Sequence, residues 1–137
     1  IERAGWADAT RIPLQGDAST RAYERLVKPT GEHAILMIAP PRPDGPPIRR
    51  GKSYSAIAKL AESVHAFAAV DRGLIEAGFS APRILGEELD AGLLILEDFG
   101  REPFVEADGP IPTRYAEATR CLAALHGKAL PGTLPVD

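Results

Sequence analysis

The 137-residue sequence predicts an α+β fold. Short stretches with the alternation or continuous apolarity of strands occur first as a group of three and later as a group of two. A long segment with helical periodicity separates the groups, and a second such segment follows them. Strand hairpins packed with one helix are typical of an α+β unit rather than of a doubly wound parallel sheet.

The first three strands are expected at residues 11–15, 22–28 and 33–39. The first two flank a turn of small residues and should form a hairpin. The third, His33–Ala39, is apolar without interruption, which predicts a central strand covered on both faces. Pro40 and Pro41 should end it, because proline removes a backbone donor.

Residues 55–77 have apolar side chains at three- and four-residue steps, which predicts one long helix. Asp71 is the one charged residue on that apolar stripe. Gly78 is placed to end the helix in the left-handed conformation.

Two more strands are expected at residues 82–89 and 93–96, joined by a tight turn at Asp90–Gly92. A linker follows, marked by Pro110 and Pro112. The apolar spacing of residues 115–126 predicts a second amphipathic helix, on which we expect Cys121 to be buried.

Composition excludes several classes of protein. A net charge of −3 and an isoelectric point of about 5.6 give no basic footprint for nucleic acid. No apolar run approaches the roughly 18 residues of a membrane span. A single cysteine allows no internal disulfide and fits a reducing, cytoplasmic location. The chain starts without Met and ends in a loop, so we expect a piece of a longer polypeptide.

The turn Gly16–Arg21 is the first candidate site. Small residues at a hairpin tip leave backbone N–H groups exposed and let a phosphate approach closely. Most turns of this kind only reverse the chain, so the motif does not establish a site alone.

A second candidate, Gly45–Ser53, has some features of the phosphate-binding loop of P-loop ATPases. Five residues rather than four separate its glycines, and Pro46 offers no N–H to a phosphate. A P-loop ATPase is therefore a third reading, in which Lys52 would be essential for ATP binding.

Four segments in order resemble the N-terminal lobe of kinase-like phosphotransferases, above all the aminoglycoside phosphotransferase and choline kinase family: Gly16–Tyr23, Ile35–Pro41, Gly78–Leu85 and Gly92–Gly100. The Asp-Ala-Ser turn and the Ala-Pro-Pro strand end look most like bacterial cell-wall amino-sugar kinases. Those enzymes phosphorylate the anomeric hydroxyl of N-acetylmuramate and N-acetylglucosamine. Some relatives that resemble this chain follow an N-terminal ATPase domain, and the start at Ile1 would suit such a fusion.

The resemblance implies a kinase-like N-lobe with a five-stranded antiparallel sheet and one long helix at residues 1–100, a hinge and linker at 101–112, and the first helix of a truncated C-lobe at 113–137. It further implies ATP as cofactor. The phosphates would lie against the turn residues, and the base between a backbone hinge and two apolar side chains. The implied binding residues are Gly16, Asp17, Ala18, Ser19, Thr20, Arg21, Met37, Leu96, Glu97, Asp98 and Phe99.

The sequence departs from the broader family at two matched positions. The third strand of that family carries a lysine that contacts the phosphates and pairs with a helix glutamate. Here Met37 takes the first position, and Phe67 lies near the second. Losing both leaves no buried, unpaired charge. Several basic residues could supply the missing cation, and we expect Arg21 first because it lies in the turn.

The catalytic part implied by the resemblance is absent from this chain. The family's His-Gly-Asp and Asp-x-Asp motifs hold the hydroxyl-orienting Asp and the Mg²⁺ ligands, whereas here Lys128 follows His126-Gly127. The fragment alone should be inactive, with a small-molecule amino sugar or related alcohol as the whole protein's substrate. The alternative is a nonenzymatic module that binds a nucleotide or a partner through an exposed apolar face.

Overall fold

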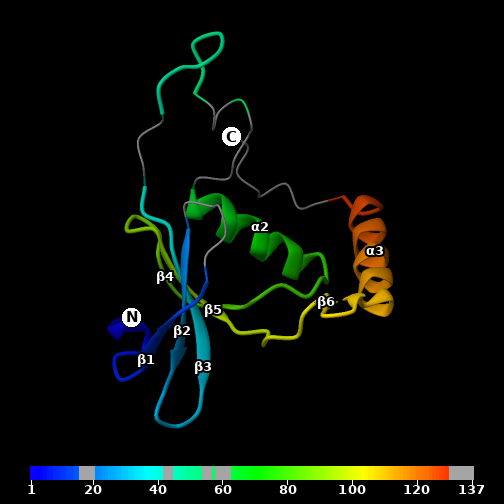
Figure 1. Ribbon diagram of the computed structural model, residues 1–137. Helices are drawn as coiled ribbons and strands as arrows, with labels where there is room; N and C mark the ends of the chain where they lie inside the picture. The colour runs from blue at the N-terminus through cyan, green and yellow to red at the C-terminus, as the bar shows by residue number, and fades with distance from the viewer. Residues whose placement is uncertain (16–20, 42–44, 54–56, 58–62, 130–137) are drawn as a thin grey trace.

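The computed structural model describes residues 1–15, 21–41, 45–53, 57 and 63–129 (Figure 1). Five strands form one sheet in the order β1-β2-β3-β5-β4, and each neighbouring pair is antiparallel. The predicted α+β class and the five-stranded antiparallel sheet are therefore confirmed.

The strands lie close to their expected positions: β1 (Thr10–Pro13), β2 (Ala22–Val27), β3 (His33–Ile38), β4 (Ile84–Glu88) and β5 (Leu93–Glu97). β3 is the central strand, with β2 on one side and β5 on the other. The register puts Ala22 opposite Ile38 and Val27 opposite His33. On the other side, Ile38 is opposite Leu93 and Ala34 is opposite Glu97.

The prediction of one continuous helix over residues 55–77 is wrong at Ser63. That residue is extended (φ −95°, ψ 132°), and its side chain accepts a hydrogen bond from the His65 N–H, so it caps helix α2 (Val64–Glu76). At the other end, Gly78 has φ +84° and donates to the Ile75 carbonyl, and Phe79 N–H donates to the Leu74 carbonyl. The predicted stop at Gly78 is thus confirmed as a Schellman motif.

The C-terminal elements start earlier than expected. A small hairpin, β6 (Val105–Glu106) and β7 (Gly109–Pro110), lies within the predicted linker, and helix α3 (Pro112–His126) begins with proline at its first turn. No residue of α3 is buried against the described part of the chain. The expectation that Cys121 is buried is wrong, because no described element packs over its side chain and it is exposed.

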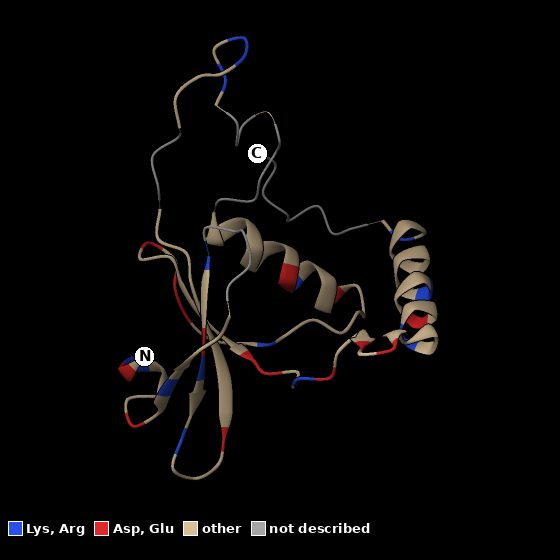
Figure 2. Ribbon diagram, viewed as in Figure 1, with Lys and Arg blue, Asp and Glu red and all other residues tan. Residues whose placement is uncertain are grey.

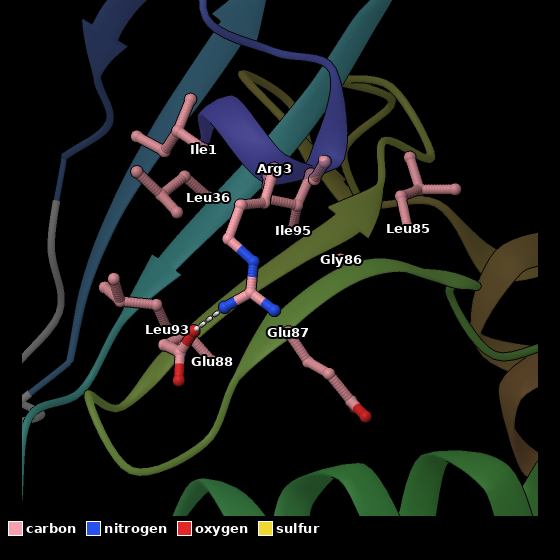
Figure 3. A pocket seen from close by; sticks show the side chains of 10 residues that line it. Ile1, Arg3, Leu36, Leu85, Gly86, Glu87, Glu88, Leu93 and Ile95 are labelled. Atoms are coloured by element: carbon pink, nitrogen blue, oxygen red, sulfur yellow. Dashed lines mark hydrogen bonds and ion pairs between the residues drawn. The ribbon is translucent and has the colours of Figure 1, made fainter.

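The two faces of the sheet are covered by different segments (Figure 1). Helix α2 packs on one face, where Val64 and Phe67 contact the strands. The short helix η1 (Glu2–Ala4) and the residues after it cover the other. Between η1 and strands β4 and β5 lies a cleft of about 260 Å³, over which Arg3 pairs with Glu88 at 3.3 Å (Figure 3).

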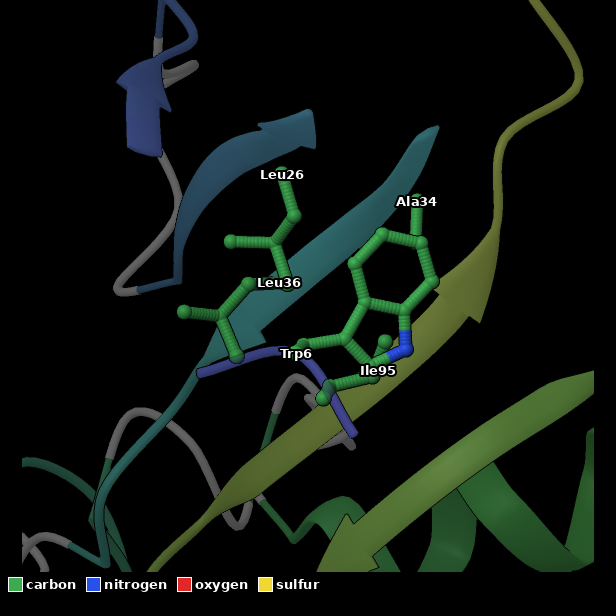
Figure 4. Close-up of a cluster of buried hydrophobic side chains, with 5 residues drawn as sticks. All are labelled: Trp6, Leu26, Ala34, Leu36 and Ile95. Atoms are coloured by element: carbon green, nitrogen blue, oxygen red, sulfur yellow. The ribbon is translucent and has the colours of Figure 1, made fainter. Parts of the chain in front are cut away.

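Each face has its own apolar cluster. Opposite α2, the indole of Trp6 packs against strand side chains (Figure 4) in a cluster of Trp6, Leu26, Ala34, Leu36 and Ile95. Under α2, the cluster consists of Met37, Ala39, Val64, Leu94 and Leu96. The central strand therefore supplies alternate residues to both clusters, as its continuous apolarity predicted.

Asp71 on α2 is the exception in this packing. It is buried, and among the described residues its Oδ2 has no hydrogen-bond partner. Burial raises the pKa of this carboxyl, against a smaller opposing effect of Arg72. The folded state therefore holds the proton to higher pH than the unfolded state, whose pKa is about 3.9. Stability is lost as the pH rises from that value through the raised pKa of the folded state.

We expect Asp71→Asn to remove this loss. The variant should be more stable than the wild type by about 1 kcal/mol near pH 7 and should lose that advantage in acid. Urea denaturation at pH 3.5 and pH 7 measures the difference, with the exposed Asp90→Asn as the matched control. An equal effect of Asp71→Asn at both pH values would contradict the prediction.

Acidic and basic residues are interspersed over the strands, loops and helices rather than gathered in a basic stripe (Figure 2). Among the described residues, no helix is both long and apolar enough to cross a bilayer.

Candidate functional site

The residues that lead into and out of the β1–β2 turn lie at one end of the sheet. Leu14 N–H donates to the Tyr23 carbonyl at 2.9 Å, which extends the hairpin up to the turn. The predicted phosphate-binding residues Gly16, Asp17, Ala18, Ser19 and Thr20 lie outside the described residues. The residue that follows the turn, Ala22, lies at the end of the sheet beside Ile38, which is paired in turn with Leu93.

Arg21 leaves the turn and lies over the ring of Phe67 on α2, with 5.6 Å between its guanidinium carbon and the ring centroid. Phe67 packs on the cluster that contains Met37. The two positions matched to the missing lysine and glutamate thus meet in one apolar cluster, and Arg21 brings a cation to its edge. A guanidinium can both stack on an aromatic face and bind a phosphate through its N–H groups.

Met37 and Leu96 share the α2-facing side of the sheet, two residues apart in register. Met37 is fully buried and Leu96 is 5% exposed. In this structure both side chains belong to the core under α2, and contact of either with a base stays a prediction.

The hinge segment begins where β5 ends, at the opposite end of the strands from the turn. Glu97 pairs with Arg83 through both carboxylate oxygens, at 3.1 and 3.3 Å. Hydrogen bonds from the Arg83 guanidinium and backbone N–H hold the pKa of Glu97 below its usual value. The Glu97 N–H donates to the Arg83 carbonyl at 2.9 Å, so this donor is used within the sheet.

Asp98 is not a solvated strand end. Its carboxylate accepts two hydrogen bonds from Arg25 on β2, Nε to Oδ2 at 2.5 Å and Nη2 to Oδ1 at 3.2 Å. It also accepts from the Gly100 N–H at 2.8 Å. Burial alone would raise the pKa of Asp98, but these hydrogen bonds outweigh it and hold the pKa below its usual value.

Arg25 is the site residue that the sequence did not reveal. It lies 73 positions before Asp98, and only the strand register brings them together. A signal was present in the sequence, because an aspartate directly after a buried apolar strand needs a counter-charge or hydrogen-bond donors. An open cleft of about 330 Å³ borders the pair, lined by Arg25, Val27, His33, Asp98, Gly100 and Arg101.

The residues flanking the turn and the predicted hinge segment therefore lie at the two ends of the same stretch of sheet. Ala22 beside the turn and Val27 at the hinge end are five residues apart on β2, about 17 Å by the rise of an extended strand. Phe99, the last residue of the predicted hinge segment, is 61% exposed and accessible to a ligand or to a further part of the protein.

The P-loop-like segment folds differently from a phosphate-binding loop. Arg49 and Lys52 pair across a tight turn, and Lys52 N–H donates to the Arg49 carbonyl at 3.0 Å. The central residues of the turn, Arg50 and Gly51, both have positive φ (52° and 73°), as in a type I′ turn. Lys52 thus closes a reverse turn with Arg49, a geometry that counts against the P-loop reading.

The C-terminal end of α3 contacts α2. His126 is the last residue of α3, as expected for a helix-end residue. Lys128 donates to the carbonyl of Ala77 at the C-terminus of α2 and lies 5.3 Å from the centroid of the Phe79 ring. A cation at that position stabilises the carbonyl end of a helix.

The structure offers no metal site within residues 1–15, 21–41, 45–53, 57 and 63–129: no three His, Cys, Asp or Glu side chains gather there. The described residues therefore do not fit a Mg²⁺ ion held by protein ligands alone.

Comparison with known proteins agrees with the sequence resemblance. The chain is 38% identical over 146 aligned positions to the N-acetylmuramate/N-acetylglucosamine kinase of Caulobacter vibrioides, across 97% of this chain and 40% of that protein. It is 28% identical over 136 positions to the protein of the same name from Pseudomonas aeruginosa, across 96% of this chain and 35% of that protein. No family model matches the chain. The chain thus spans about two fifths or less of the length of the two relatives named here. The activity of the whole protein is therefore a proposal.

Proposed function

We propose that this chain is the ATP-binding lobe of a small-molecule phosphotransferase that transfers the γ-phosphate of ATP to a hydroxyl of an amino sugar. The observation that supports the proposal is that the residues flanking the small-residue turn and the segment held by Arg25 after β5 lie at opposite ends of the same strands. The names of the two relatives support the reaction and the substrate class. Residues 1–100 form the lobe, 101–112 the linker, and 113–137 the start of a helical lobe.

In this proposal a nucleotide extends along the sheet from hinge to turn. The base lies beside Leu96, Glu97, Asp98 and Phe99, read by backbone groups beyond the Glu97 N–H. The phosphates lie against the backbone of Gly16, Asp17, Ala18, Ser19 and Thr20. Arg21 supplies the cation that Met37 cannot.

Transfer forms a bond between the sugar oxygen and the γ-phosphorus and breaks the bond to the β-phosphate oxygen, so that ADP leaves. The hydroxyl proton needs a carboxylate, and the phosphate charge needs Mg²⁺. Among the described residues no cluster of metal-ligating side chains occurs, and Lys128 stands where the family's His-Gly-Asp motif has its aspartate. We therefore place those groups outside this chain and expect the fragment alone to be inactive.

Arg21→Ala tests the phosphate assignment. A charge-assisted contact with the phosphates contributes about 1.5–3 kcal/mol, so ATP affinity should fall about 10- to 100-fold. Displacement of a fluorescent ATP analogue from the full-length protein measures it. The matched control is Arg11→Ala, which removes an arginine of the same hairpin that pairs with Glu24. Unchanged affinity in Arg21→Ala would remove Arg21 from the site.

The nonenzymatic alternative is favoured by one observation, the apolar side chains exposed around α3: Phe104, Tyr115 and Leu122 are about half exposed. An exposed apolar surface of this kind indicates contact with another part of the protein or with a partner. In the proposed phosphotransferase the cover is the rest of the same polypeptide, whereas in a binding module it is another protein. A full-length protein that binds ATP yet never transfers phosphate to a sugar would favour the module.

A further inference from the structure

The Arg25–Asp98 pair differs in burial from the other ion pairs of this sheet. The side chains of Arg25 and Asp98 are 10% and 2% exposed, and two hydrogen bonds join them in parallel. Arg11–Glu24 has the same two-bond geometry, at 2.5 and 3.0 Å, but the arginine is half exposed. Arg83–Glu97 is likewise open to solvent on its arginine side.

The pair spans the central strand. The register aligns Arg25 with Ile35 and Ile35 with Leu96, so β3 lies between the strand that carries Arg25 and the strand that leads to Asp98. Arg25 therefore reaches across β3 to the first residue past β5. The same carboxylate accepts from Gly100 N–H, and Gly100 has φ +93°. The Asp98 side chain thus links the residue after β5 to strand β2 and fixes the turn that follows.

Stability alone does not explain such a pair. Two charges withdrawn from water lose hydration that their mutual attraction only partly offsets, and apolar residues of the same volume often hold a fold equally well. An apolar pair cannot reproduce the hydrogen bonds that fix the orientation of the Asp98 carboxylate. It therefore also loses the hydrogen bond that this carboxylate accepts from the Gly100 N–H. The geometry that would be lost is the path of the backbone between Glu97 and Gly100.

We propose that Arg25 is a positioning residue of the nucleotide site, which holds the base-reading backbone at Asp98 and Phe99 in place through the Asp98 carboxylate. This inference rests on the proposed function, because it assigns the held segment to the nucleotide. Arg25 acts on ATP through Asp98 and needs no contact with the base. Its loss should weaken nucleotide binding and leave the transfer step nearly unchanged.

The test is the double variant Arg25→Met/Asp98→Leu in the full-length protein. The apolar pair should keep the melting temperature near that of the wild type. The KM for ATP should rise about 10-fold or more, because misplacing a binding group by an ångström is costly, while kcat stays within about 2-fold. Arg25→Lys keeps the positive charge but cannot make the two parallel hydrogen bonds of the guanidinium, so its KM for ATP should lie between those of the wild type and the double variant. The matched control, Arg11→Met, breaks the exposed pair on the opposite face and should leave the KM for ATP unchanged.

A stable double variant with the wild-type KM for ATP would overturn the proposal and leave the pair a purely structural one. If the double variant does not fold, Arg25→Lys decides: a KM equal to that of the wild type overturns the proposal, and a raised KM at unchanged kcat supports it. A wild-type protein that fails to bind ATP at all would overturn the proposed function itself, and this inference with it.

Discussion

Trp6→Ala should destabilise the protein by about 3–5 kcal/mol, the cost of emptying an aromatic-sized space in a core. Trp6 is 3% exposed and packs with Leu26, Leu36 and Ile95 on the face of the sheet opposite α2 (Figure 4). The amine of Lys28 also lies 4.2 Å from the centroid of its ring system. No other described aromatic covers this face, so neighbouring side chains cannot fill the space. Urea denaturation followed by circular dichroism measures the loss.

Two further variants calibrate this result. Trp6→Phe keeps an apolar ring and should lose much less than the alanine variant. Phe104→Ala removes a half-exposed ring that meets Tyr115 edge to face at 5.7 Å, and should cost no more than about 1.5 kcal/mol. If Trp6→Ala and the wild type had the same midpoint of urea unfolding, the N-terminal segment would not pack as described.

Gly92→Ala should cost more than about 3 kcal/mol, because two effects add. Gly92 has φ +70°, a conformation that costs an L-residue about 1–2 kcal/mol. A Cβ at this position would lie 2.1 Å from the Ala39 carbonyl oxygen and 2.7 Å from the Pro40 Cα, both backbone atoms. The two backbone segments cannot move apart without cost, because the Ala39 N–H donates to the Gly92 carbonyl at 2.8 Å. The free energy of unfolding in urea is the measurement.

Gly31→Ala is the matched control for Gly92→Ala. Gly31 has φ +87° but would place its Cβ in open space, so only the conformational cost of about 1–2 kcal/mol applies. Equal losses in the two variants would show that the contact between the β4–β5 turn and the end of β3 does not constrain Gly92.

The sheet could be predicted because its signals are local. Alternation or continuous apolarity marked each strand, and prolines or glycines bounded them, so the boundaries of β3 and β5 differ from expectation by one residue each. The break at Ser63 could not be seen in the same way. Helical periodicity continues through that position, whereas Ser63 is extended and its side chain accepts the His65 N–H, so that α2 begins there.

The candidate site was predicted in outline and not in its chemistry. The strands that flank the turn and the hinge segment could be predicted, because β1 and β5 end close to where their motifs indicated; the contact of either segment with a nucleotide stays a prediction. The partners of the hinge carboxylates needed the register: Arg25 reaches Asp98 only because β3 pairs with both neighbours in the observed alignment. Trp6 was missed for a similar reason, since a lone tryptophan in a short N-terminal segment carries no periodicity.

The central claim is that this lobe serves a phosphotransferase acting on amino sugars. The most direct measurement is phosphorus NMR of the full-length protein with Mg²⁺, ATP and either N-acetylmuramate or N-acetylglucosamine. The account predicts loss of the ATP signals, formation of ADP and appearance of a sugar 1-phosphate. If ATP stays intact with both sugars while the protein binds it, the phosphotransferase account is contradicted and the chain is a nucleotide-binding module.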